Sequence, residues 1–321
     1  MGKSKRVKNK KNKIKNNKTK KNKKHTKRSN TRNKTTKKKH MEQCAPRKDK
    51  DMLTYTCYTK KTLYDMKNIW NMRHPDNRIK SNKPYNIWRS LKKYFSYSCK
   101  KESCWLKHKY LKDNIDSSTV SKLFAPKMPD SWKKKPNEWL SSVDIMKIMK
   151  QYENKYNDFE FLGPSPIDYD AHKYNGECVW EELCEFSLKK TLDNGKKRVG
   201  IIFNLDPHYK QGSHWVAVYI DTIIGEVYYF DSYGKNTSYG TKVPSQIKKF
   251  MKNVQLQSIK MGKKYKLFYN RRRHQYGDSE CGMYCLYVII EMLNGVTFKK
   301  LNKKKIPDLK MLKLRKVYFN E

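Results

Sequence analysis

A cysteine and a glutamine near residue 280 are placed so that they could catalyse acyl transfer. Cys281 opens an apolar run, residues 281–293, whose spacing predicts a helix. A thiol at the start of a helix lies near the positive end of the helix dipole and near free N–H groups, which favours the thiolate that attacks carbonyl carbons. Gln275, six residues earlier, could return its amide toward the same place as an oxyanion donor. The segment therefore predicts a nucleophile with an oxyanion donor beside it.

A base and an acid for that thiol occur in two neighbouring segments upstream. His214 lies in residues 212–220 and Asp231 lies in residues 226–234, and both segments are rich in the β-branched and aromatic residues typical of strands. The short connection 221–225 ends in Gly and predicts a hairpin, which would bring His214 roughly opposite Asp231. Asp231 would then orient the imidazole, and the imidazole would take the thiol proton.

Each of these residues also has an ordinary structural explanation. Cys281 could be a buried helix cysteine, and Cys285, one turn later on the same face, is expected to point into the core. Gln275 could be a plain loop residue, and Asp231 could cap a turn. The rival bases are His172, His208 and His274, and the weaker acids are Asp206 and Asp221. Because neither His208 nor His274 lies on a predicted strand that faces an acid, His214 is preferred as the base.

Two further residues are candidates for contact with a substrate. Trp215 follows His214 and would wall the site, a role that is compatible with packing in the core. Gly282 follows the predicted nucleophile and lets the backbone approach it closely.

The order and spacing of these motifs resemble a superfamily of cysteine peptidases that includes the adenovirus proteases and the SUMO proteases. The shared motifs, in chain order, are His214-Trp215, Asp231, Gln275 and Glu280-Cys281-Gly282. SUMO proteases usually carry Asp where this chain has Glu280. Glu at this place is similar to the branch from large DNA viruses, which includes the African swine fever virus polyprotein protease. The resemblance covers about residues 139–295 and implies a papain-like fold of the adenovirus and SUMO-protease type.

Short aromatic and cysteine-containing pieces nearer the amino terminus add a second resemblance. Residues 57–63, 69–71, 87–88 and 99–106 resemble the extra domain of giant-virus, mimivirus-like thiol proteases. Together the resemblances imply a cysteine endopeptidase that cleaves viral structural (capsid or core) precursors at Gly-rich sites during virion maturation. They imply a location in the virion and, during infection, in the viral factory of the host cytoplasm. This chemistry requires no metal or organic cofactor.

Two other classes of function stay open at this point. The same chemistry could serve an isopeptidase that removes SUMO or another ubiquitin-like modifier. Alternatively, the chain could be an inactive virion protein that binds nucleic acid. The resemblance at the amino terminus argues against the first, and the intact set of His214, Asp231, Gln275 and Cys281 argues against the second.

Basic residues are concentrated at the start of the chain. The 321 residues carry a formal net charge of +44, and residues 1–40 contain 20 Lys or Arg and no Asp or Glu. Such a segment cannot form a core and predicts a disordered basic arm over residues 1–48, able to bind DNA or RNA without base specificity. A solubility tail or a nuclear signal is an equal alternative, and an AT-rich genome alone would enrich Lys.

The remainder of the chain is predicted to fold as two parts. A small helical amino-terminal region spans residues 49–125, and prolines at 126, 129 and 136 separate it from a catalytic domain, residues 138–321. In that domain helices are predicted at 140–149, 177–188, 244–253, 281–293 and, on the surface, 306–318, and strands at 159–162, 198–205, 212–220, 226–231 and 264–269. This order predicts an α+β fold with a central mixed sheet and the nucleophile on a buried helix.

The cysteine spacing and the hydropathy place further bounds on the chain. The sequence contains no run of about 18 apolar residues, so no membrane span is predicted. Its start also lacks the apolar segment of a secretory signal. We therefore expect a reducing environment and eight free thiols. The spacings Cys99–Cys104 and Cys178–Cys184 lack the two-residue gap of zinc motifs, and no His pair completes a set, so no structural zinc is predicted.

Overall fold

The computed structural model describes residues 43–48, 53–116, 118–234 and 242–320. The first 42 residues of the predicted basic arm lie outside the described residues, so its proposed nucleic-acid binding stays a prediction. Within the described ranges, no helix has both the length and the apolar character needed to cross a bilayer.

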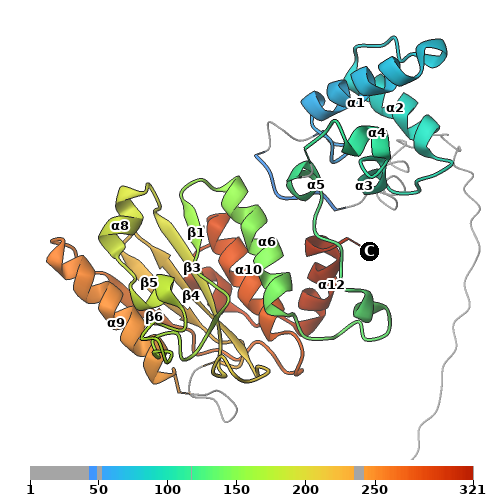
Figure 1. The fold of residues 1–321 in the computed structure, drawn as a ribbon. Helices are drawn as coiled ribbons and strands as arrows, with labels where there is room; N and C mark the ends of the chain where they lie inside the picture. The colour runs from blue at the N-terminus through green and yellow to red at the C-terminus, as the bar shows by residue number, and fades with distance from the viewer. Residues whose placement is uncertain (1–42, 49–52, 117, 235–241, 321) are drawn as a thin grey trace, which may run out of the picture. The chain divides into compact units, whose positions relative to one another are not determined.

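A six-stranded mixed sheet forms the centre of the catalytic region (Figure 1). Its strands are β1 (Phe159–Phe161), β2 (Ser165–Pro166), β3 (Arg198–Asn204), β4 (Trp215–Asp221), β5 (Glu226–Phe230) and β6 (Lys266–Tyr269). The order is β1-β3-β4-β5-β6, and β2 pairs with β3. The β3–β4 and β4–β5 pairs are antiparallel, whereas β1, β2 and β6 each run parallel to their partner. The predicted α+β fold with a mixed sheet is confirmed.

Helices cover both faces of this sheet (Figure 1). Side chains of β3 alternate between the two layers: Ile202 joins the core beneath α10 (Cys281–Leu293), and Ile201 and Phe203 join the core beneath α9 (Ser245–Lys260). The α10 layer also contains α6 (Ser142–Lys155) and α12 (Asp308–Tyr318), with α11 (Phe298–Lys303) at its edge. Because α10 lies between the sheet and other helices, it is buried nearly all round. It begins and ends at the predicted residues.

Several predicted helices differ from the observed ones: α6 and α9 continue beyond residues 149 and 253, to Lys155 and Lys260. The helix predicted over 177–188 is divided into α7 (Glu181–Cys184) and α8 (Leu188–Asp193), because Ser187 caps the second helix by accepting from the N–H of Lys190. The carboxy-terminal helix α12 lies at the surface, as predicted, with Leu309 and Val317 exposed, but its inner face is part of the core. It buries Met311 and Tyr318 in the α10 core together with the charged Arg315.

The amino-terminal region has its own hydrophobic core. Its helices are α1 (Lys60–Arg73), α2 (Pro84–Phe95), α3 (Glu102–Trp105), α4 (Lys109–Lys112) and α5 (Ser118–Leu123), with a short 3-10 turn at Pro75–Asn77. A second 3-10 turn, Asp130–Lys133, follows this region, and its Trp132 packs in the α10 core. Phe95 lies between two tryptophans of this core, with ring centroids 5.8 Å from Trp70 and 5.4 Å from Trp105. The predicted helical character of this region matches these elements, while its exact boundaries stay a prediction.

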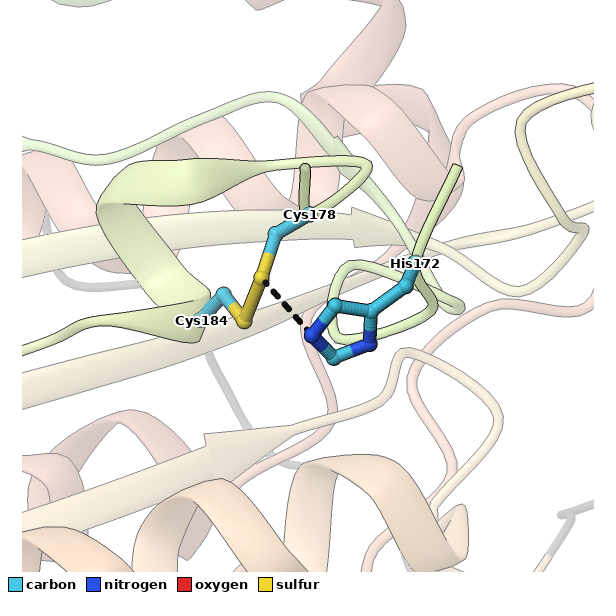
Figure 2. A group of neighbouring side chains, drawn as sticks. All are labelled: His172, Cys178 and Cys184. Atoms are coloured by element: carbon cyan, nitrogen blue, oxygen red, sulfur yellow. Dashed lines mark hydrogen bonds between the residues drawn. A yellow bond between two sulfur atoms is a disulfide. The ribbon is translucent and has the colours of Figure 1, made fainter. Parts of the chain in front are cut away.

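The expectation of eight free thiols is not met. Cys44–Cys57, Cys99–Cys104 and Cys178–Cys184 are disulfides, with Cα–Cα distances of 5.1, 5.6 and 6.3 Å. Only Cys281 and Cys285 are free, and both are buried. The expectation rested on compartment alone and could not foresee that folding brings each pair within the distance at which a disulfide can form. Figure 2 shows the third pair beside His172.

Candidate active site

Cys281 is the first residue of α10, with Glu280 in the N-cap position. Its N–H is therefore one of the N–H groups of the first turn that have no hydrogen-bond acceptor within the helix. The neighbouring Glu280 side chain is directed away from this turn into a buried ion pair with Arg315 of α12, at 2.9 Å. The guanidinium of Arg315 in turn lies 4.4 Å from the ring centroid of Trp132. Burial raises the pKa of Glu280, and Arg315 opposes that shift.

The structure brings His214 and Asp231 together, as predicted. The imidazole Nε2 lies 2.8 Å from Oδ1 of Asp231, and the Cys281 side chain lies near enough to the imidazole to help raise its pKa. Since Nε2 faces Asp231, Nδ1 is the ring nitrogen left for the sulfur. The three side chains, separated by up to 67 residues in the chain, therefore form one continuous arrangement of thiol, imidazole and carboxylate.

The register of the hairpin differs by two residues from the predicted one. Ala217 pairs with Phe230 and Asp221 pairs with Glu226, so a four-residue turn joins β4 to β5. Continued beyond the strands, this register sets Tyr233, not Asp231, across from His214, and the two rings stack at 4.8 Å. Both His214 and Asp231 lie just outside the strands, where the chain can bend and let the carboxylate reach the ring.

The environment of His214 favours its charged form. Burial by itself would lower the pKa of the imidazole, but the hydrogen bonds and charges of Asp231 and Cys281 more than offset burial and raise the pKa to about 9. At neutral pH the ring therefore carries a positive charge beside the sulfur, and it can donate a proton to a leaving group.

This shift predicts how stability depends on pH. Because the folded pKa of about 9 exceeds the unfolded value of 6.5, the contribution of His214 is complete below pH 6.5 and is lost as the pH rises through 9. The loss amounts to roughly 3 kcal/mol of unfolding free energy. The free energy of unfolding can be measured with urea between pH 6 and 10 for the wild type and for His214→Gln, which controls for other titrating groups. The difference between the two proteins should shrink as the pH rises through 9. Parallel pH profiles for the two proteins would contradict the prediction.

Asn270 holds the acid in place and was not identified from the sequence. Its side-chain oxygen accepts from the N–H of Asp231 at 2.9 Å, and its amide nitrogen donates to the carbonyl of Asp231 at 2.6 Å. Asn270 follows β6 directly, and its side chain is 1% exposed. The parallel pairing of β5 with β6 places it there, which a sequence without long-range pairing cannot reveal.

Gln275 is buried, and its side-chain amide is held by hydrogen bonds to Ser232, in the loop that carries Asp231, and to Gly277. Its Oε1 accepts from the Ser232 hydroxyl at 2.6 Å, and its Nε2 donates to the carbonyl of Gly277 at 2.8 Å. A carbonyl can only accept, so this contact identifies the NH₂ end and leaves one of its two hydrogens for another acceptor. The backbone of Ser232 also accepts from the N–H groups of His274 and Gln275. Ser232 therefore joins the Asp231 loop to the predicted oxyanion donor.

We expect Ser232→Ala to lower kcat about tenfold with little change in KM, because a freer amide stabilises the oxyanion less well. Steady-state cleavage of a peptide substrate measures both constants. In a Gln275→Ala background the same substitution should leave kcat unchanged. The matched control is Ser258→Ala, since Ser258 is also fully buried and donates to a carbonyl, that of Gln255, on α9. An equal loss of kcat in Ser258→Ala would show that Ser232 stabilises the fold and does not position the Gln275 amide.

The rival residues have other partners in the structure. His274 is buried, accepts from the N–H of Ile306 and contacts the side chain of Asn302, and burial lowers its pKa. His208 contacts Asp168 at 2.8 Å, and His172 lies near Cys178. Asp206 accepts from the Ser213 hydroxyl, and Asp221 accepts from two N–H groups of its own turn. Cys285 is fully buried, and burial raises its pKa well above the ordinary value.

A groove begins beside the site and is called the Trp215 groove here. It has a volume of about 1190 Å³, and its walls include Trp139, Leu140, Trp180, Trp215 and the polar residues Asp206 and Gln211. Trp215 is anchored by a hydrogen bond from its indole N–H to the carbonyl of Leu140 at 3.0 Å. A Cβ at Gly282 would lie 3.1 Å from Leu140 and 3.3 Å from Trp215. A side chain at position 282 would therefore push Leu140 or Trp215 aside by a few tenths of an ångström, and the glycine allows close packing at the start of α10.

Access to the sulfur is restricted in this state. Cys281 is 1% exposed, and His214 has 12% of its side chain exposed. A substrate carbonyl can reach the sulfur only after neighbouring side chains move, as when a substrate enters the groove.

Comparison with known proteins gives one consistent result. The model of the Ulp1 protease family, C-terminal catalytic domain, matches residues 145–320. The chain is 31% identical over 267 residues to a putative thiol protease of Acanthamoeba polyphaga mimivirus, covering 83% of this chain and 84% of that protein. It is 25% identical over 235 residues to a cysteine protease of African swine fever virus, covering 70% and 84% respectively. The counterpart in another isolate of that virus is named a SUMO-1 cysteine protease.

The fold also agrees with a solved structure. The crystal structure of the African swine fever virus protease superposes with a TM-score of 0.61 at 19% identity, covering 87% of this chain and 96% of that one.

Proposed function

Because the chain belongs to the Ulp1 protease family and is a cysteine protease, we propose that it is an endopeptidase that cleaves viral structural precursor proteins at Gly-rich sites. The observation that carries the proposal is the convergence of Cys281 at the start of α10 with His214, which is hydrogen-bonded to Asp231. This arrangement supplies a nucleophile, a proton carrier and a group that orients it.

The reaction proceeds in two stages on these residues. His214 holds the proton of Cys281 as an ion pair, and the sulfur attacks the carbonyl carbon of the scissile peptide. The N–H of Cys281 and the free hydrogen of the Gln275 amide hold the oxyanion. His214 then gives its proton to the leaving amine as the C–N bond breaks. Water, activated by the same imidazole, releases the acyl group and restores the thiol.

The preference for glycine is supported by the packing beside the nucleophile. Leu140 and Trp215 pack tightly against the start of α10, where a Cβ at position 282 would lie 3.1 and 3.3 Å from them. Cys281 is also only 1% exposed, so we expect substrate residues that approach its sulfur from the Trp215 groove to be narrow. Glycine residues on both sides of the scissile bond meet that requirement, because they have no side chain.

The similarity to the mimivirus protein extends beyond the catalytic domain. The alignment spans 267 residues, whereas the family model covers the 176 residues from 145 to 320. The similarity therefore continues into the amino-terminal region, which the catalytic family model does not include. We propose that the protein acts in the viral factory and is packaged in the virion, where basic residues 1–40 bind nucleic acid.

An isopeptidase for a ubiquitin-like modifier is the second candidate. The family is named after such a protease, and one viral relative is called a SUMO-1 cysteine protease. Both activities use the same chemistry and differ in what the enzyme recognises beyond the Gly-Gly sequence.

Substrate panels separate the two functions. Wild-type and Cys281→Ala proteins should be incubated with peptides blocked at both ends that contain internal Gly-Gly-X sites, and with fluorogenic SUMO and ubiquitin. We expect the wild type to cleave the internal peptides with a kcat/KM at least equal to that for the modifiers, and the variant to cleave neither. Exclusive cleavage of a modifier would replace the proposal with the isopeptidase, and equal cleavage by both proteins would reject catalysis by Cys281.

A further inference from the structure

A cluster of three metal-binding side chains lies outside the active site, in the segment between β2 and α8. The Nε2 of His172 and the sulfurs of Cys178 and Cys184 all lie within 4.8 Å of one another. Figure 2 shows the imidazole turned toward the sulfur of Cys178, which lies 3.9 Å from Nε2. Within the described part of the chain, no other group of three His, Cys, Asp or Glu side chains meets this criterion.

The backbone builds this cluster from two short elements. His172 and Cys178 form an isolated antiparallel bridge, and the chain turns between them at Gly176, whose φ of 85° suits glycine. Cys184 ends the single turn of α7, and its N–H donates to the carbonyl of Trp180, which brings it back beside Cys178. Backbone hydrogen bonds, and not only the disulfide, therefore hold the three donor atoms close together.

We propose that, when Cys178 and Cys184 are reduced, these two thiolates and Nε2 of His172 bind one Zn²⁺. Two thiolates and an imidazole are the donors that Zn²⁺ prefers, at about 2.3 and 2.0–2.1 Å, and water completes a tetrahedral site. The metal displaces the two thiol protons. The disulfide drawn in Figure 2 is then the oxidised form of the same site.

The charge around the cluster suits a cation. A depression adjoining Cys178 is lined by five glutamates and two lysines. The glutamates are Glu160, Glu177, Glu181, Glu182 and Glu185. In a chain with a formal net charge of +44, this concentration of acidic residues is unusual and makes the local potential favourable for Zn²⁺.

The position of the cluster gives the metal a structural consequence. Lys173, Val179 and Trp180, which surround the cluster residues in the chain, also line the Trp215 groove. Residues 173–177 are all exposed and have few packing contacts of their own. A metal bound to residues 172, 178 and 184 therefore fixes one wall of the groove in a reducing environment, and the disulfide fixes it in an oxidising one.

The test measures the metal directly in the full chain. Cys281→Ala protein is reduced with a phosphine, which supplies two electrons, becomes its oxide with oxygen from water and leaves two thiols. The protein is then equilibrated with Zn²⁺ and desalted, and zinc is counted by mass spectrometry. We expect about one zinc per chain, with affinity at least tenfold weaker in His172→Ala and in Cys178→Ser/Cys184→Ser. Co²⁺ should give a thiolate charge-transfer band that Cys178→Ser/Cys184→Ser removes, whereas His172→Ala should need more Co²⁺ to produce it.

The chain offers a matched control in its other closely spaced cysteine pair. Cys99→Ser/Cys104→Ser removes the same number of thiols from the amino-terminal core, and it should leave zinc binding unchanged. A measurement without substitutions guards against variants that fail to fold: in reduced wild-type protein, Zn²⁺ should slow alkylation of Cys178 and Cys184 at least about tenfold, as read by peptide mapping. Absence of retained zinc, zinc held equally well without the two cysteines, or unprotected alkylation would each overturn the proposal.

Discussion

Replacing Cys281 by alanine is expected to lower kcat/KM by at least about 10⁴-fold, because the reaction then has no nucleophile and only substrate binding and the oxyanion donors remain. Cleavage of an internal Gly-Gly-X peptide, followed by mass spectrometry of the products, gives the rate. Circular dichroism should be unchanged, since alanine is a better helix former than cysteine at the first position of α10.

The adjacent free cysteine provides the control for this experiment. Cys285 lies one turn later on α10, is 0% exposed and has a pKa raised well above the ordinary value by burial. Cys285→Ala should leave kcat/KM within about threefold of the wild type while lowering the free energy of unfolding by about 1 kcal/mol through the small cavity. If Cys285→Ala lost activity as completely as Cys281→Ala in a folded protein, the assignment of the nucleophile would be wrong.

The sequence was most informative where short-range patterns determine structure. The apolar run from Cys281 to Leu293 predicted the bounds of α10. Strands β4 and β5 were recognised from their β-branched and aromatic residues, so His214 and Asp231 could be placed on neighbouring strands. Their register was wrong by two residues because the length of the turn decides it, and a five-residue connection allows more than one turn.

Contacts made by distant segments were not accessible in the same way. Ser232 and Asn270 act on Gln275 and Asp231 across 43 and 39 residues, through loops that meet only because β6 lies parallel to β5. His172 was considered only as a rival base, although it lies six residues from Cys178, because the sequence test for zinc required a two-residue gap between cysteines and a pair of histidines. Arg315 was assigned to a surface helix because the pattern of α12 does not show that a guanidinium enters the core to pair with Glu280.

Asp231→Ala is expected to lower kcat/KM on the order of 10³–10⁴-fold, since His214 then loses both its orientation and the negative charge that holds its proton. Asp231 is 1% exposed, and its Oδ1 accepts from Nε2 of His214 and from the N–H of Tyr233. The measurement is kcat/KM of the variant and of the wild type as a function of pH from 5 to 10. Activity of the wild type should fall as the pH rises through about 9, because His214 then loses its positive charge.

Asp231→Asn separates the two contributions, because it removes the charge and keeps an acceptor. The N–H of Tyr233 requires an oxygen at the Oδ1 position, so the amide oxygen should stay there and still accept from Nε2 of His214. Without the carboxylate charge, burial dominates and the pKa of His214 falls from about 9 toward or below its ordinary value of 6.5. Activity should then decline above about pH 6.5, and the loss at pH 8 should be about a hundredfold, smaller than for alanine. A high-pH limb that stayed near 9 in Asp231→Asn would show that Asp231 does not set the charge of His214, and equal losses for asparagine and alanine would show that its oxygen does not orient the ring.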